Sequence, residues 1–209
     1  MADAELRGTT ALLDDLLGKL VDKHGADASV DIGTLIDALR GRAYGVIMLL
    51  MALPCCLPFV YGLPQIVALP MLALAWQMAA GREVVWLPAG LRRRTFRISL
   101  LAGTVARARP WLKRFEILAG PRLAFLSAGT GLRVVGAILL VPCASILIPL
   151  PLTNSMPALG VAIVSVGLIE RDGLLILFGL FVGLAWVAAL IIGGEAAISW
   201  FITFARSLV

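Results

Sequence analysis

Two long stretches of the sequence carry no charged side chain. The first runs from Ala43 to Gly81 and the second from Val134 to Ile169. As one straight helix, the first stretch would extend about 58 Å at about 1.5 Å per residue, nearly twice a bilayer core of about 30 Å. We therefore expect each stretch to fold back on itself as a helical hairpin.

Each stretch is interrupted near its middle by the same spacing of prolines. The first contains Pro58 and Pro64, the second contains Pro151 and Pro157, and the two pairs lie 93 residues apart. Proline removes a backbone donor and is disfavoured inside a helix, so both pairs are expected to break a helix. The shared spacing predicts an internal repeat of two Pro-broken hairpins.

The arms of these hairpins are expected to be short. In the first stretch, we expect helix continuity to fail at Pro54, Pro58, Gly62, Pro64 and Pro70. This leaves arms near 43–57 and 65–80, and the second hairpin has arms near 134–148 and 158–169. Because a full crossing needs about 20 residues, two geometries remain open. The hairpins are either re-entrant and turn inside the membrane, or pairs of short, ordinary spanning helices.

Further segments complete a predicted all-α, polytopic membrane fold. Residues 9–41 have apolar positions at helical spacing and predict two amphipathic helices, the second starting near Asp31. Their acidic character favours packing on protein over packing on anionic lipid. Leu174–Gly194 is apolar for 21 residues and predicts one full transmembrane helix, and the apolar tail 196–205 is an interfacial helix or a further insertion. The predicted units are N-terminal amphipathic helices (1–42), a first hairpin (43–81), a basic connector (82–130) and a second hairpin with the C-terminal helix (131–209).

Composition and charge support this assignment. Hydrophobic residues make up 60% of the chain, against about half in a typical soluble domain. Residues 82–122 hold ten Arg or Lys side chains against Glu83 and Glu116, so the positive-inside rule predicts that this connector is cytoplasmic. Because a basic loop of a membrane protein usually determines topology, we expect the lipid bilayer as a partner and no nucleic acid.

The turns of the two hairpins hold the first set of candidate site residues. Repeated units with broken helices line the central sites of many transporters, where freed backbone groups and helix ends hold ions or polar groups. The candidates for an ion or substrate pathway are Tyr61, Gly62, Gln65, Thr153, Asn154 and Ser155. The alternative is that the prolines make tight turns that bind no ligand.

Charged residues between apolar segments form the second set. Glu170, Arg171 and Asp172 precede Gly173, and Glu195 stands inside the C-terminal apolar region. One interpretation is a connector whose charges pair with one another and in which Gly173 makes the turn. The other is a charge network that gates the hairpin. Glu195 is either a functional intramembrane carboxylate or a helix cap at the interface.

No motif of a known enzyme class is present, and we expect neither enzymatic activity nor a cofactor or metal site. The three cysteines, Cys55, Cys56 and Cys143, lack the spacing of metal ligands and suit packing in membrane helices. Gly179 and Gly183 form a G-x3-G pattern in the C-terminal span. This pattern permits close helix approach, in a homodimer or within one subunit.

The sequence resembles the ExoD family of bacterial exopolysaccharide-synthesis proteins over residues 12–194. The likeness is carried most specifically by the segment from Ile148 through Pro151-Leu-Thr-Asn-Ser-Met-Pro157 to Gly173, and also by Ile32–Gly45, the Pro58–Pro64 turn, Gly81-Arg82 and Trp86-Leu-Pro88. The resemblance implies a bacterial inner-membrane protein with a role in exopolysaccharide production and in tolerance of alkaline conditions. It brings no catalytic residues with it.

Two hypotheses about activity follow. The first is an ion or small-solute transporter that supports exopolysaccharide synthesis or export. The second is a non-transporting scaffold that binds the polysaccharide-synthesis proteins. An enzyme acting on a lipid-linked sugar would need a convergent acidic or metal site, and the sequence contains no motif for one.

Overall fold

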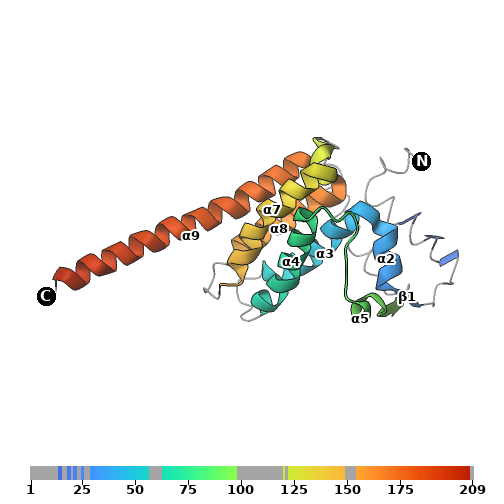
Figure 1. Cartoon of the computed structure of the whole chain (residues 1–209), viewed down its shortest axis with the longest axis horizontal. Coiled ribbons are helices and arrows are strands. Elements are labelled where there is room, and N and C mark those ends of the chain that lie inside the picture. The colour runs from blue at the N-terminus through green and yellow to red at the C-terminus, as the bar shows by residue number, and fades with distance from the viewer. Residues whose placement is uncertain are drawn as a thin grey trace.

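The computed structural model describes residues 14–15, 18–19, 21–22, 25, 29–56, 63–97, 120, 122–148 and 154–207. Apart from two strands of three residues each, the regular structure in this part of the chain is helical, which confirms the all-α prediction (Figure 1). In chain order the elements are β1 (Ser29–Asp31), α2 (Ile32–Leu39), η2 (Arg40–Arg42), α3 (Ala43–Cys55), α4 (Leu63–Ala79), α5 (Ala89–Arg92), β2 (Thr95–Arg97), η3 (Ala124–Ser127), α7 (Gly129–Ile146), α8 (Ser155–Glu170) and α9 (Gly173–Ser207).

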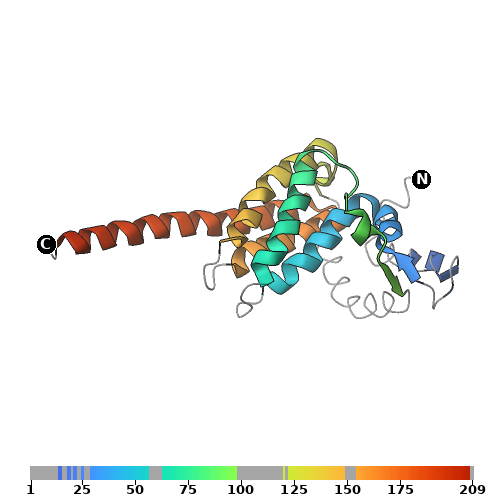
Figure 2. The same cartoon turned by 60° about the horizontal axis from the view of Figure 1, so that its bottom comes forward.

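Four helices, α3, α4, α7 and α8, pack together as two hairpins. The first arm of each hairpin lies against the second arm of the other, so that α3 packs on α8 and α4 packs on α7 (Figure 2). Their shared core is apolar and tightly closed, with the side chains of Met48, Met71 and Leu139 fully buried. The hairpins therefore form one bundle.

Both hairpins point the same way. Gly45, near the start of α3, lies against Ser165 and Ile169 near the end of α8. Gly136, in the first half of α7, lies against Ala75, Met78 and Ala79 in the last two turns of α4. All entries and exits of the hairpins therefore meet at one end of the bundle, which we call the flank end. The last residues of α3 and α7 and the first residues of α4 and α8 lie at the other end, which we call the tip end. The two hairpins are therefore parallel to each other in the bundle.

Glycine permits these close approaches. A Cβ atom on Gly45 would lie 2.7 Å from the carbonyl oxygen of Ser165, and one on Gly136 would lie 2.6 Å from the backbone nitrogen of Ala79. The same holds between α8 and α9, where a Cβ on Gly160 would lie 2.8 Å from the carbonyl oxygen of Gly179. The G-x3-G pattern of α9 thus serves packing within the subunit, and it gives a homodimer no support.

The prolines act differently from the prediction at one position. Pro70 lies inside α4 and the helix continues through it, so the expected break there is wrong. Pro54 is the second-to-last residue of α3, which ends at Cys55, so helix continuity fails one residue after it. Pro70 falls mid-helix, where neighbouring helices can support the backbone that a proline disturbs. Pro64 and Pro157 lie in the first turns of α4 and α8, where a missing N–H costs no hydrogen bond. Pro58 and Pro151 lie outside the described residues.

Among the described residues, two helices are long and apolar enough to cross a membrane, judged by length and composition. They are Gly129–Ile146 and the segment Gly173–Gly194 of α9. The helix α7 begins at Gly129, five residues before the arm predicted at 134–148, and is 18 residues long. The predicted tail is not a separate helix, because α9 runs for 35 residues, about 52 Å, and extends well past the other helices (Figures 1 and 2). The shorter apolar helices are α3, the segment Pro64–Ala79 and α8.

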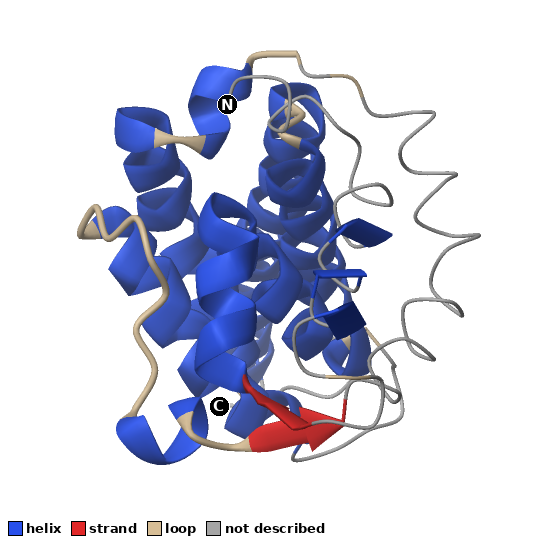
Figure 3. Cartoon of the chain, turned by 90° about the vertical axis from the view of Figure 1, so that its right-hand side faces the viewer, coloured by secondary structure: helices blue, strands red, loops and turns tan. Residues whose placement is uncertain are grey.

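Within the N-terminal region, the second predicted amphipathic helix corresponds to α2, and α2 packs on the bundle. Asp31 ends β1 and caps α2 by accepting hydrogen bonds from the backbone and hydroxyl of Thr34. The apolar side of α2 joins the bundle core through Ile36 and Leu39. β1 pairs with β2 in antiparallel register (Figure 3), and Arg92 forms an ion pair of 2.6 Å with Asp37. The first predicted amphipathic helix lies mostly outside the described residues.

Candidate functional site

The two ends of the bundle differ in charge. α3 and α4 contain no charged residue, α7 contains one (Arg133) near its start, and α8 contains one (Glu170) at its last position. Arg42, Arg82 and Asp172 border the same helix ends. The described residues therefore place the charges of the bundle at the flank end, while the tip end is uncharged.

At the flank end, the segment after α4 is held back against the bundle. Gly81, with φ of +77°, lets the backbone N–H of Arg82 donate to the carbonyl of Gln77, which closes the helix. The amide of Gln77 then pairs with the backbone of Trp86, accepting from its N–H at 2.7 Å and donating to its carbonyl at 3.1 Å. The hydroxyl of the fully buried Tyr44 donates to the carbonyl of Arg82 at 3.0 Å.

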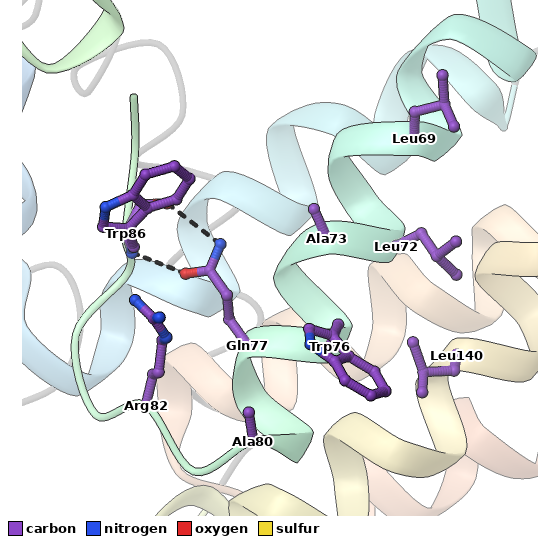
Figure 4. A pocket seen from close by; sticks show the side chains of 9 residues that line it. All are labelled: Leu69, Leu72, Ala73, Trp76, Gln77, Ala80, Arg82, Trp86 and Leu140. Carbon is purple, nitrogen blue, oxygen red and sulfur yellow. Dashed lines mark hydrogen bonds between the residues drawn. The ribbon is translucent and has the colours of Figure 1, made fainter. Parts of the chain in front are cut away.

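These contacts create an open groove along the outer face of α4, which we call the α4 groove. It encloses about 550 Å³. Figure 4 shows Arg82 and Trp86 at one end and Leu69 at the other. The groove is lined by Leu69, Leu72, Ala73, Trp76, Gln77, Ala80, Arg82, Trp86 and Leu140. Sequence reasoning missed it, and the only signal in the sequence was the nearness of Trp76 and Trp86 to Arg82.

Residues 170–173, three charged residues followed by Gly173, form a tight turn between α8 and α9. Arg171 adopts the left-handed conformation, with φ of 56°, so the residue that makes the turn is Arg171 and not Gly173. A side chain at Gly173 would collide with Leu123, because its Cβ would lie 2.5 Å from the Cβ of that residue. Glycine at this position thus makes room for the segment before η3.

Asp172 accepts three hydrogen bonds from backbone N–H groups. It is buried, and its carboxylate accepts from the backbone N–H groups of Leu174 at 2.8 Å, Leu175 at 3.3 Å and Gly120 at 3.0 Å. It is therefore the N-cap of α9 and a tie to the end of the connector. Glu195 lies within α9, and its side chain is not among those described.

At the tip end, the structure describes three of the six candidate pathway residues. Gln65 is the third residue of α4, Ser155 opens α8 and Asn154 directly precedes it. The oxygen atoms Gln65 Oε1 and Asn154 Oδ1 are buried and have no hydrogen-bond partner among the residues that the structure describes. α4 and α8 are the diagonal pair of the bundle, so these two amides stand on opposite sides of it. Tyr61, Gly62 and Thr153 lie outside the described residues.

The chain matches one protein-family model and is similar to two curated proteins. The model of the family described as "Exopolysaccharide synthesis, ExoD" matches residues 13–192. The uncharacterized protein slr1875 of Synechocystis sp. (strain ATCC 27184 / PCC 6803 / Kazusa) is 29% identical over 176 residues, which cover 80% of this chain and 82% of that protein. Protein ExoD of Rhizobium meliloti (strain 1021) is 24% identical over 196 residues, which cover 90% of this chain and 79% of that protein.

No solved structure matches the chain. The family match covers most of its length and agrees with the resemblance seen in the sequence. The chain belongs to the ExoD family of exopolysaccharide-synthesis proteins.

Proposed function

We propose that this chain is a multi-pass protein of the bacterial inner membrane that supports exopolysaccharide synthesis or export by moving an ion or a small polar solute. Membrane placement is supported by two candidate spans and by large apolar side chains on the outside of the bundle. Leu50, Ile66 and Phe181 are each more than 60% exposed, which lipid would tolerate and water would not.

The proposed orientation puts the flank end in the cytoplasm. The connector that leaves this end holds most of the positive charge of the chain. Since both hairpins point the same way, one orientation satisfies the positive-inside rule for both. The hairpins then enter the bilayer from the cytoplasmic side and carry their uncharged tips into it, as repeated and re-entrant units.

One observation carries the transport proposal, namely the unpartnered amide oxygens of Gln65 and Asn154 at the tip end. A buried acceptor without a partner costs about 1–3 kcal/mol, so a fold that keeps two of them has a use for them. Oxygen atoms next to broken helices coordinate cations in transporters. A cation or proton carried there would also explain a role in tolerance of alkaline conditions.

The test is flux through purified protein in proteoliposomes, with fluorescent reporters of Na⁺, K⁺ and internal pH. Asn154→Leu and Gln65→Leu should each reduce flux at least about tenfold, the effect of losing one interaction of about 1.4 kcal/mol. Ser145→Ala is the matched control, because the Ser145 hydroxyl already donates to the carbonyl of Pro142 at 2.8 Å near the same end. Normal flux in both leucine variants, with folding intact, would exclude these amides from a pathway.

The charge network proposed from the sequence is tested in the same assay. Glu170 ends α8 at the flank end, where a gate on the cytoplasmic side would act. Glu170→Gln should then reduce flux while Glu83→Gln, at an exposed position of the same end, leaves it unchanged.

The second candidate function is a non-transporting scaffold for polysaccharide-synthesis proteins. Two observations favour it: the closed apolar core between the hairpins, and the exposed side chains of Arg93 and Arg94 in the connector. A scaffold predicts no flux in any variant and a stable complex in detergent extracts, weakened by Arg93→Glu with Arg94→Glu. Neither function requires an enzyme active site or a cofactor, and both are compatible with a homodimer.

A further inference from the structure

The α4 groove has the length of one bilayer leaflet. It extends from Leu69 in α4 to Ala80, the residue directly after this helix, a separation of eleven positions or about 16 Å at about 1.5 Å per residue. Half of a hydrocarbon core of about 30 Å is about 15 Å. Its walls are almost entirely apolar and are formed by Leu69, Leu72, Trp76 and Leu140. An apolar channel of this length on the lipid-facing side of a bundle fits one acyl chain.

The flank end of the groove is positively charged. Arg82 lines it directly, and the guanidinium of Arg133 lies against Gly81, where a Cβ atom would stand 2.6 Å from Arg133 Cζ. Both arginine side chains are exposed, and within the described ranges neither makes an ion pair or a side-chain hydrogen bond. Glu83 is the one acidic neighbour in this segment, and it is exposed to solvent.

Two tryptophans flank the boundary between the apolar and charged parts. Trp76 is 65% exposed and Trp86 is 58% exposed. Tryptophan is enriched where hydrocarbon meets head groups, because its ring is apolar and its N–H is polar. The hydrogen bonds between Gln77 and Trp86 fix the position of this rim relative to α4. The groove therefore changes from apolar to cationic at the level of a head group.

We propose that the α4 groove binds one anionic phospholipid of the leaflet at the flank end. Its acyl chain lies against Leu69, Leu72 and Trp76, and Arg82 at the end of the groove holds its phosphate (Figure 4). Arg133, whose guanidinium lies against the neighbouring Gly81, adds a second positive charge there. Guanidinium groups suit a phosphate because they form paired, charge-assisted hydrogen bonds with its oxygens. The proposal rests on the membrane placement in the proposed function, and it is independent of transport.

The experiment is native mass spectrometry of the full chain released from detergent after incubation with phosphatidylglycerol. We expect one retained lipid, with weaker retention of diacylglycerol, which lacks the phosphate, and no competition from millimolar inorganic phosphate. Arg82→Gln should reduce the bound fraction about tenfold, the usual effect of losing a charge-assisted hydrogen bond. Ala73→Trp, which fills the apolar part from an exposed position of α4, should also prevent retention.

Arg93→Gln is the matched control, because it removes the same charge from an exposed position outside the groove. If Arg93→Gln lowered the lipid-bound fraction as much as Arg82→Gln, the lipid would be held by the general positive charge of the protein and not by the groove. That result would overturn the proposal. Equal retention of diacylglycerol, unchanged retention in Ala73→Trp, or preferential retention of a polyprenyl phosphate over phosphatidylglycerol would do the same. Because the readout is a bound mass, failure of flux in proteoliposomes leaves the proposal standing, and failure of binding leaves transport standing.

Discussion

The flank end and the tip end of the same four helices differ in how particular polar side chains, three at the flank end and two at the tip end, find hydrogen-bond partners. At the flank end, the polar groups of Tyr44, Gln77 and Asp172 all have partners in the chain. At the tip end, the amide oxygens of Gln65 and Asn154 are buried without one. Satisfied polar groups fix a geometry, whereas unsatisfied ones are ready to bind something else. The difference separates the part of the bundle that anchors it from the part that we propose is functional.

The largest expected effect concerns the packing that joins the two hairpins. Gly136→Leu should lower the unfolding temperature in detergent most, by a destabilisation of about 3 kcal/mol, because the new side chain meets the backbone of Ala75 and Ala79. Gly90→Leu is the control, since nothing lies within 4 Å of a Cβ at that position. Similar melting temperatures for the two variants would mean that α4 and α7 do not pack as described.

The next effect tests the anchored flank end. Asp172→Ala should destabilise the fold by about 2 kcal/mol, because it removes the cap of α9 and leaves the N–H of Gly120 without its acceptor. Asp172→Asn retains an acceptor oxygen, so it should destabilise the fold clearly less than Asp172→Ala does. The measurement is thermal unfolding of both variants in the same detergent. If asparagine and alanine were equally harmful, capping would not be the role of this residue.

At the tip end, substitutions should not lower the stability of the fold, in contrast to Asp172→Ala at the flank end. Asn154→Leu and Gln65→Leu each replace a buried, unpartnered acceptor with an apolar side chain of similar size, and should leave stability unchanged or raise it by about 1 kcal/mol. The same two variants are expected to reduce flux. Strong destabilisation would show that the amides have structural partners and would remove the contrast between the ends.

The smallest effect lies at the N-terminal helix. Hydrogen bonds from Thr34 lower the pKa of Asp31 below its ordinary value of 3.8. A carboxyl whose pKa is lower in the folded state adds stability above the unfolded pKa and loses it as pH falls through the folded pKa. The wild type should therefore lose stability relative to Asp31→Asn below pH 3.8. Parallel unfolding curves of the two proteins from pH 6 to pH 3 would contradict this.

Much of the fold could be predicted from the sequence, because its signals are local. The charge-free stretches located both hairpins, and Pro64 and Pro157 mark the first turns of their second arms. The break predicted at Pro70 was wrong, because neighbouring helices support a proline in an apolar bundle and the sequence does not show which helices are neighbours. The pairing of α3 with α8 was equally hidden, since α8 is apolar on all sides and its pattern identifies no single buried face.

Part of the candidate site could also be predicted from the sequence, and part could not. Gln65 and Asn154 could be singled out because polar side chains are rare near the hairpin turns. The α4 groove could not, because it exists only where the segment after Gly81 folds back. That fold is fixed by long-range contacts of Gln77 with Trp86 and of Tyr44 with Arg82. The left-handed turn at Arg171 was assigned to Gly173, since glycine is the residue that usually makes such turns.

The central claim is that the hairpins enter the membrane from one side, with the flank end in the cytoplasm. Single cysteines can test it in a background where Cys55, Cys56 and Cys143 are alanine. Glu83→Cys and Ala128→Cys report on exposed positions of the flank end, and Ile148→Cys reports on an exposed position of the tip end. A membrane-impermeant maleimide should leave both flank cysteines unlabelled in intact spheroplasts and label both in inverted vesicles, while Ile148→Cys stays unlabelled in the vesicles. Labelling of either flank cysteine from outside the spheroplasts would contradict the account.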